Sequence, residues 1–314
     1  MYYVGLDVGG TFVKGGIIDE TGKILIKDSI PTGVGRPHSE IIKDWANFYL
    51  KLLADAGLSR AEVSGVGIGI PGTIDDETGV VAYANNFGWR QIPIRQEFSK
   101  WCDVEIHMGN DANCAALGET KFGAGKGYNN TVLFTLGTGV GAGIVIDGKL
   151  LLGNNSAGAE MGHMSIMMDG ELCTCGRRGC IEAYASATAL IRDTRRAIEK
   201  NPDTMMREVP LDEVNGKTCF DYARLGDKTA QEVVANYQRY LAEAIIDAVN
   251  IFRPEIVMIG GGVSYQGDYL LEPIRRMVDK YSYGGDINPR VVIQPATLGN
   301  DAGFIGAAAL LMLN

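Results

Sequence analysis

The feature that most constrains the fold of this chain is an internal repeat with a constant spacing of 128 residues. The paired positions are Gly9 and Gly137, Gly15 and Gly143, Ile18 and Ile146, and Asp19 and Asp147. Each copy has an apolar strand pattern, a glycine-rich turn, a second apolar strand pattern and a polar turn. Two unrelated hairpins could match at these positions because they share glycine by chance. A repeat with a constant spacing instead predicts a duplicated domain.

Chain length and glycine content agree with two folded domains. The chain has 314 residues, whereas single hydrophobic cores rarely grow beyond roughly 250–300 residues. Glycine accounts for 42 residues, about twice the usual share of ~7%, yet it follows no collagen period and lies within apolar segments. We expect a small N-terminal α/β domain over 1–117 and a larger C-terminal α/β domain over 118–301, which carries the cysteine cluster described below. A closing helix over 302–314 is expected to join the first domain.

Hydrophobic periodicity predicts most of the regular elements. The expected helices span 39–56, 111–121, 181–200, 228–252 and 302–313. The expected strands span 63–70, 131–136, 255–259 and 291–294, in addition to those of the first repeat.

Charge and hydropathy exclude several classes of partner. The net charge is −9 and the isoelectric point about 5.0, with no basic run long enough to neutralise a nucleic-acid backbone. No apolar run approaches the ~20 residues of a membrane-spanning helix. The N-terminus enters a strand pattern at once and lacks the basic region of a signal peptide. We therefore expect a cytoplasmic protein that binds neither nucleic acid nor membranes.

Two glycine-rich turns, one in each repeat, have the composition of phosphate-binding loops. The turns at 7–11 and 136–141 combine glycines, which let the backbone approach a ligand closely, with a threonine hydroxyl donor. Neither is a Walker loop or a Rossmann fingerprint, because no Gly-Lys-Ser/Thr follows and the next element is a strand. A single turn of this kind is more often structural, whereas two could bind one polyphosphate together.

A carboxylate suited to proton abstraction lies in the segment 109–113, ahead of a helix of small residues. Asp111 could cap this helix, or it could accept the proton of a hydroxyl group that is being phosphorylated. The loop 84–89 is polar and aromatic. Its carboxamides suit vicinal sugar hydroxyls, although the loop could also be a plain turn.

One histidine and three cysteines form a cluster with metal-ligand spacing. His163, Cys173, Cys175 and Cys180 lie within eighteen residues. A lone histidine is more often a core residue, and a Cys-x-Cys pair alone could be redox-active. Three thiolates and one imidazole together fill the tetrahedral coordination of a structural zinc ion, which favours zinc.

The glycine segments resemble motifs of the superfamily that contains sugar kinases, heat-shock chaperones and actin. LDVGGTFVKGGIID and TLGTGVGAGIV resemble its first and second phosphate motifs, and IGGGVS resembles its adenosine motif. The resemblance implies the two-lobed actin-like ATPase (ribonuclease H-like) fold, with duplicated βββαβα domains around a cleft. It places Asp7 near Mg²⁺. The implied ATP contacts are Gly9, Gly10, Thr11, Lys14, Gly137, Thr138, Gly139, Gly260, Gly261 and Gly262.

Two further segments resemble ROK-family sugar kinases. NDANCAALGE is similar to their catalytic segment and GHMSIMMDGELCTCGRRGCIEAYAS to their zinc signature. The resemblance makes Asp111 the general base and His163, Cys173, Cys175 and Cys180 the zinc ligands. The sugar contacts that it implies are Gly72, Asn85, Asn110, Asp111, Glu160, His163 and Glu182.

The resemblance implies an ATP-dependent hexokinase that phosphorylates the 6-hydroxyl of glucose, with Mg²⁺, a structural Zn²⁺ and a homodimeric assembly. The pattern CTCGRRGCIEAYAS favours the glucokinases of the family. Kinases for N-acetylmannosamine, N-acetylglucosamine, mannose, fructose or allose share this frame, and polyphosphate could replace ATP. A sugar-responsive ROK regulator is disfavoured, because the first turn begins at residue 7 and leaves no room for a DNA-binding domain. An actin-like or chaperone-like ATPase is disfavoured by Asp111 and the zinc cluster.

Overall fold

Two five-stranded sheets in the computed structural model repeat the same strand order. The first has the order β3(Ile24–Pro31)-β2(Phe12–Asp19)-β1(Tyr2–Val8)-β4(Val63–Ile70)-β8(Ile106–Asn110). The second has the order β11(Lys149–Leu150)-β10(Val140–Ile146)-β9(Thr131–Leu136)-β12(Ile256–Gly260)-β13(Val292–Pro295). In the first sheet β1 pairs antiparallel with β2 and parallel with β4, and in the second sheet β12 pairs parallel with both β9 and β13. This duplication confirms the predicted α/β fold class.

The structure describes residues 1–313, so residue 314 of the predicted closing helix lies outside the described part. The chain divides into two compact units. Unit 1 comprises Met1–Asn129, Gly143–Ala159 and the segment from Thr297 onward, and unit 2 comprises Asn130–Ala142 and Glu160–Ala296. The domain boundaries predicted from the sequence, 1–117 with 302–314 and 118–301, stay a prediction. Among the described residues, no helix is both long and apolar enough to cross a membrane.

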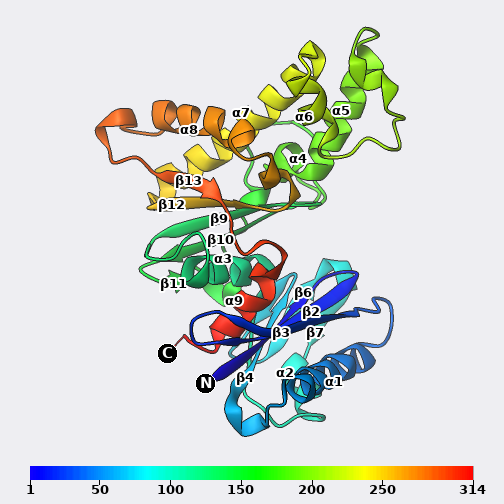
Figure 1. The fold of residues 1–314 in the computed structure, drawn as a ribbon, viewed down its shortest axis with the longest axis vertical. Coiled ribbons are helices and arrows are strands. Elements are labelled where there is room, and N and C mark those ends of the chain that lie inside the picture. The colour runs from blue at the N-terminus through cyan, green and yellow to red at the C-terminus, as the bar shows by residue number, and fades with distance from the viewer. Residues whose placement is uncertain (314) are drawn as a thin grey trace. The chain divides into compact units, whose positions relative to one another are not determined.

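Most of the predicted helices have bounds close to those in the structure (Figure 1). The helices of unit 1 are α1(His38–Ala56), α2(Ile94–Ser99), α3(Asp111–Phe122) and α9(Ala302–Leu310). Those of unit 2 are α4(Glu182–Ala185), α5(Ala187–Lys200), α6(Thr218–Arg224), α7(Lys228–Phe252) and α8(Asp268–Tyr281). A small sheet of unit 1 has the order β5(Thr73–Asp75)-β6(Val80–Ala84)-β7(Trp89–Ile92).

The predicted helix over 181–200 is wrong as a single element. Ser186 has an extended backbone, with φ −77° and ψ 161°, and separates α4 from α5. Its side-chain oxygen accepts a hydrogen bond from the Ala189 N–H at 3.0 Å, which caps α5. The apolar spacing runs through both helices, so it does not reveal the break. In the same unit, Asp227 caps α7 by accepting from the Ala230 N–H at 2.8 Å.

Glycines without a Cβ atom let α9 lie directly on its neighbours in unit 1. A Cβ atom on Gly67 of β4 would lie 1.7 Å from the Ala307 carbonyl oxygen, and one on Gly306 would lie 1.6 Å from the Cys114 carbonyl oxygen. Real side chains cannot occupy either position. Consequently α9 packs tightly against α3, β1 and β4, and the red α9 ribbon lies beside α3 in Figure 1.

A fully buried carboxylate joins the end of α3 to the segment that precedes α9. Glu119 has no exposed surface. Its Oε2 accepts from the Ala124 N–H at 2.9 Å and from the Thr297 N–H at 3.1 Å, and its Oε1 accepts from the Leu298 N–H at 2.7 Å. A buried carboxylate is tolerated when donors surround it in this way.

Replacing this carboxylate tests its structural role. We expect Glu119→Ala to lower the free energy of unfolding by roughly 3–5 kcal/mol, because three partly buried backbone N–H groups each lose a charged acceptor at a cost of about 1 kcal/mol or more. Urea unfolding followed by circular dichroism measures the change. Glu62→Ala is the control, since Glu62 is an exposed carboxylate that accepts from the Ser59 N–H at 2.9 Å and from the Ser59 hydroxyl at 2.7 Å. Equal losses in the two variants would contradict the role given to Glu119.

Candidate functional site

Asp111 lies at the first position of α3, and the preceding residue caps the helix. The Asn110 side-chain oxygen accepts from the Ala112 N–H at 2.9 Å and from the Asn113 N–H at 3.2 Å. The capping role considered for Asp111 therefore belongs to Asn110. The pKa of Asp111 is raised above its ordinary value by burial, which outweighs the hydrogen bond that its carboxylate accepts from the Ala112 N–H.

A second carboxylate, Asp7, interacts with Asp111 in unit 1. The pKa of Asp7 is raised to about 6, first by burial and then by the negative charge of Asp111, while Lys14 acts in the opposite direction. Lys14 is the register partner of Asp7 on β2. A Cβ atom on Gly303 would lie 2.5 Å from the Asp7 carboxyl carbon, so α9 covers Asp7 closely. Two half-buried acidic groups with raised pKa values are suited to a site that receives a cation or a proton.

The first glycine turn connects β1 and β2 and is held by Thr32. The Gly9 N–H donates to the Phe12 carbonyl oxygen at 3.0 Å, and the Thr32 hydroxyl donates to the Gly9 carbonyl oxygen at 2.6 Å. Gly10 and Thr11 are exposed at the tip of the turn. The structure thus places the predicted phosphate contacts of this turn on the strand pair that carries Asp7 and Lys14.

Gly72 contacts both Asn110 and the segment that precedes Asn85. The Asn110 amide donates to the Gly72 carbonyl oxygen at 3.1 Å. Gly72 has a φ of 121°, and a Cβ atom there would lie 2.1 Å from the Tyr83 carbonyl oxygen, so this close approach requires glycine. Asn85 is exposed, and its side-chain oxygen accepts from the Tyr83 hydroxyl at 2.9 Å. The structure therefore links Gly72 with Asn110 by a direct bond and with the loop of Asn85 by packing.

The second glycine turn and the third glycine segment lie together in unit 2. A Cβ atom on Gly261 would lie 2.3 Å from the Leu136 carbonyl oxygen, immediately before Gly137. The Gly137 carbonyl oxygen accepts from the Ala187 N–H at 2.9 Å. The Thr188 hydroxyl donates to the Thr138 carbonyl oxygen at 2.8 Å. Segments that are over 120 residues apart in the chain thus form one glycine-rich surface beside the start of α5.

Glu182 joins this surface to the cysteine loop. Its Oε2 accepts from the Val140 N–H at 3.2 Å, and a Cβ atom on Gly139 would lie 2.2 Å from the same oxygen. Its Oε1 accepts from the Thr174 hydroxyl at 2.6 Å. The carboxylate therefore bonds both the second glycine turn and the segment between two cysteines of the cluster.

The ligand atoms of His163, Cys173, Cys175 and Cys180 all lie within 4.8 Å of one another. The distance from Cys173 Sγ to His163 Nδ1 is 3.6 Å, and the distance from Cys175 Sγ to Cys180 Sγ is 3.8 Å. Tetrahedral zinc with ordinary bond lengths has S···N edges of about 3.6 Å and S···S edges of about 3.8 Å. The geometry and the donor set thus fit a closed zinc site, in which Nδ1 of His163 faces the metal.

The remaining predicted sugar contact lies close to His163 in the chain. The His163 N–H donates to the Glu160 carbonyl oxygen at 3.0 Å, within the short turn Met161–His163. Glu160 is exposed and His163 is partly buried. A zinc ion on Nδ1 would leave the other ring nitrogen, Nε2, for a ligand.

Sequence reasoning missed two threonines whose hydroxyl groups hold parts of the candidate site. Thr32 holds the turn of Gly9 from 23 positions away, and Thr174 contacts Glu182 across the cysteine loop. Neither residue stands out by type or spacing. Thr174 could have been suspected only because it separates Cys173 from Cys175.

Comparison with known proteins gives a consistent result over the whole chain. The sequence model of the ROK family matches residues 3–313. A glucokinase of Thermotoga maritima is 38% identical over 311 residues, which cover 98% of this chain and 96% of the relative. The crystal structure of a ROK family glucokinase from Streptomyces griseus, in complex with glucose and AMPPNP, superposes with a TM-score of 0.81. It is 34% identical, with 99% of each chain covered.

A transcriptional regulator is also similar to this chain, at lower identity. The xylose repressor of Caldicellulosiruptor bescii is 26% identical over 310 residues, which cover 98% of this chain and 77% of the repressor. The similarity to the glucokinase is higher and spans nearly all of both proteins.

The raised pKa of Asp7 makes a prediction about stability and pH. Folding favours the protonated carboxyl group, so the stability of the wild-type protein should fall as the pH rises from about 4 to about 6 and stay lower above that. Asp7→Asn removes this penalty. In metal-free buffer, the variant should gain about 2–3 kcal/mol relative to the wild type between pH 4 and pH 7.5.

Denaturant unfolding at the two pH values provides the measurement. Asp19→Asn is the control, because hydrogen bonds from Thr21 hold the pKa of Asp19 below its usual range, so that this group is ionised at both pH values. The effect of Asp19→Asn on stability should therefore be nearly the same at pH 4 and at pH 7.5. If the effect of Asp7→Asn on stability does not depend on pH, the pKa of Asp7 is not raised in the folded protein.

Proposed function

The chain belongs to the ROK family, and we propose that it is an ATP-dependent glucokinase that transfers the γ-phosphoryl group of ATP to the 6-hydroxyl of glucose. The observation that carries the proposal is Asp111 at the start of α3, a half-buried aspartate whose pKa is raised by desolvation, in a chain that aligns over nearly its full length with glucokinases. The solved relative that binds glucose and AMPPNP, an ATP analogue, supports both substrates.

Asp111 would act as the general base of the reaction. Its carboxylate would accept the proton of the sugar 6-hydroxyl while the hydroxyl oxygen attacks the γ-phosphorus and ADP leaves. A raised pKa makes the carboxylate a stronger base, and its place at the N-terminus of α3 holds it close to backbone N–H groups that favour negative charge. The Asn110 cap fixes the backbone from which this carboxylate projects.

The glycine turns are proposed to bind the nucleotide. Exposed backbone N–H groups at Gly10 and Thr11 suit phosphate oxygens, and Gly137 to Gly139 supply the corresponding turn of unit 2. Lys14 adds a positive charge beside Asp7. Mg²⁺, when bound, would neutralise phosphate charge, and Asp7 is proposed to interact with its water shell.

Each unit carries proposed sugar contacts of its own. Asn85, Asn110 and the Gly72 turn of unit 1 offer amide and carbonyl groups to hydroxyls. Glu160, His163 and Glu182 of unit 2 carry the contacts that the family resemblance implies. Zinc would hold His163 by Nδ1 and so orient Nε2 toward a hydroxyl.

Other members of the family define the alternatives to glucose. Another hexose or an N-acetylhexosamine as acceptor, and polyphosphate as donor, remain compatible with the same base and turns. Glucose is the first choice because the glucokinase of Thermotoga maritima aligns over nearly its full length. The proposed assembly is a homodimer, as the family resemblance implies.

Substitution of the base gives the central mutational test. Asp111→Asn keeps the size and hydrogen-bonding capacity of the side chain but cannot accept the proton. We expect kcat to fall by about 10²–10⁴-fold, while calorimetry shows glucose binding within about threefold of the wild type. A coupled assay for ADP provides kcat.

Asp103→Asn is the matched control, because Asp103 is an exposed aspartate of the same unit with no assigned role. It should retain wild-type turnover. Near-normal turnover in Asp111→Asn would refute the assignment of the base.

The zinc proposal predicts about one zinc ion per chain by elemental analysis. Cys175→Ser should lower the zinc content and weaken glucose binding, because His163 would lose its fixed orientation. Cys219→Ala, at a cysteine outside the cluster, should leave the zinc content unchanged. A zinc-free preparation with full activity would contradict a structural zinc.

A further inference from the structure

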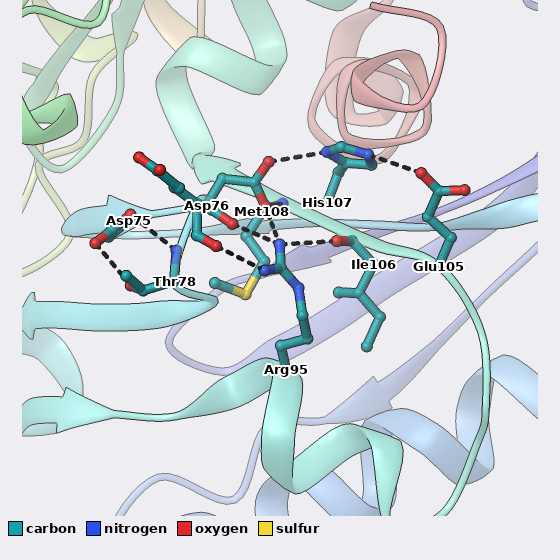
Figure 2. A network of polar contacts seen from close by, with 9 residues as sticks. Asp75, Asp76, Thr78, Arg95, Glu105, Ile106, His107 and Met108 are labelled. Atoms are coloured by element: carbon teal, nitrogen blue, oxygen red, sulfur yellow. Dashed lines mark hydrogen bonds and ion pairs between the residues drawn. The ribbon is translucent and has the colours of Figure 1, made fainter.

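A network of charged side chains lies along the outer edge of β8, the strand that leads into Asn110 and Asp111. Figure 2 shows the Asp76 carboxylate pointing from the end of β5 toward His107 and Met108, with Arg95 reaching up from α2. The residues of this network have no role in the chemistry proposed above. The side chains of Asp76, Arg95 and His107 are each about one-third exposed.

The network replaces the neighbouring strand that β8 lacks. Within residues 1–313, β8 is the last strand of its sheet and pairs with β4 on one side only. On the other side, Asp76 Oδ1 accepts from the Met108 N–H at 2.7 Å, and the Arg95 guanidinium donates to the Ile106 carbonyl oxygen at 3.1 Å. Two side chains therefore satisfy edge groups that would otherwise bond water.

The carboxylate of Asp76 is the centre of this arrangement. Arg95 Nη2 donates to Asp76 Oδ1 at 2.9 Å, and His107 Nδ1 lies 2.8 Å from Asp76 Oδ2. His107 Nε2 lies 3.2 Å from Glu105 Oε1, which brings a further carboxylate to the outer end of the network. Charge-assisted hydrogen bonds of this kind are stronger than neutral ones and fix the geometry of their partners.

The segment from Gly72 to Asp76 holds β8 at two points. At its start, the Gly72 carbonyl oxygen accepts from the Asn110 amide. At its end, Asp76 bonds the Met108 N–H, two residues before Asn110. Because Asn110 caps α3 and Asp111 is the next residue, any movement of the end of β8 also moves the base.

We propose that Asp76, held by Arg95, is a positioning residue for phosphoryl transfer, which anchors the edge of β8 and so fixes Asp111 against the sugar hydroxyl. This inference rests on the proposed function of Asp111. Asp76 itself touches neither substrate; it acts through the Met108 backbone and the Asn110 cap.

Three variants of the full chain test this role. Asp76→Ala removes the acceptor, Asp76→Asn keeps an oxygen that can accept from the Met108 N–H, and Asp75→Ala is the matched control. Asp75 is the adjacent carboxylate, but its side chain bonds Thr78 within the hairpin (Figure 2).

The measurements are kcat, the KM values for glucose and ATP, and the melting temperature. Asp76→Ala should lower kcat by about ten- to a hundredfold with the KM for ATP within about threefold, because small displacements of a reacting group have large effects on rate. Asp76→Asn should recover most of kcat, and Asp75→Ala should keep it. Wild-type kcat in Asp76→Ala, or equal losses of kcat in Asp75→Ala and Asp76→Ala, would overturn the proposal.

A second readout separates this proposal from the proposed function. Hydrogen exchange should become faster at the Ala112 and Asn113 amides in Asp76→Ala but not in Asp75→Ala, whether or not the wild type phosphorylates glucose. Unchanged exchange at these amides would overturn the positioning role. An inactive wild type with the expected exchange pattern would refute only the function. If Asp76→Ala does not fold, Arg95→Met removes the guanidinium that holds Asp76 and should give the same loss of kcat and the same exchange pattern.

Discussion

The close contact between α9 and its neighbours is the constraint on which the rest of unit 1 depends. Gly67 on β4 and Gly306 on α9 have no Cβ atom, so the helix backbone rests on the sheet and on α3. An added methyl group would overlap a carbonyl carbon or oxygen at either position. The same helix brings Gly303 against Asp7, and the burial that results raises the pKa of that carboxyl group. Packing and electrostatics of the site thus share one cause.

Burial of acidic groups gives the site its chemistry at a cost in stability. Asp7 and Asp111 both have raised pKa values, and the charge of Asp111 contributes to the shift of Asp7. A strained carboxylate of this kind is retained where a cation or a proton will meet it. Glu119 shows the contrasting solution, since a ring of donors accommodates its buried carboxylate without a ligand.

The sequence repeat predicts a duplicated domain because each hairpin is local and its glycines recur at one spacing, whereas the strand order of each sheet is seen only in the structure. Helix α7 could also be predicted from the sequence, since its apolar stripe and its Asp227 cap lie within one segment. The break at Ser186 was not predictable, because apolar spacing continues through it. Contacts such as Glu119 with Leu298 or Asp76 with Met108 join distant segments by single hydrogen bonds and leave no periodic signal.

For the site, the types and spacing of the cysteines were the basis of the metal prediction. That Asn110, and not Asp111, caps α3 became clear only from the geometry.

The most direct test of this account is the turnover of the wild-type protein with ATP across a panel of hexoses and N-acetylhexosamines. The account predicts the highest kcat/KM with glucose and the formation of one ADP for each glucose 6-phosphate. Release of ADP at the same rate without sugar, or sugar binding without turnover, would contradict a glucokinase built around Asp111.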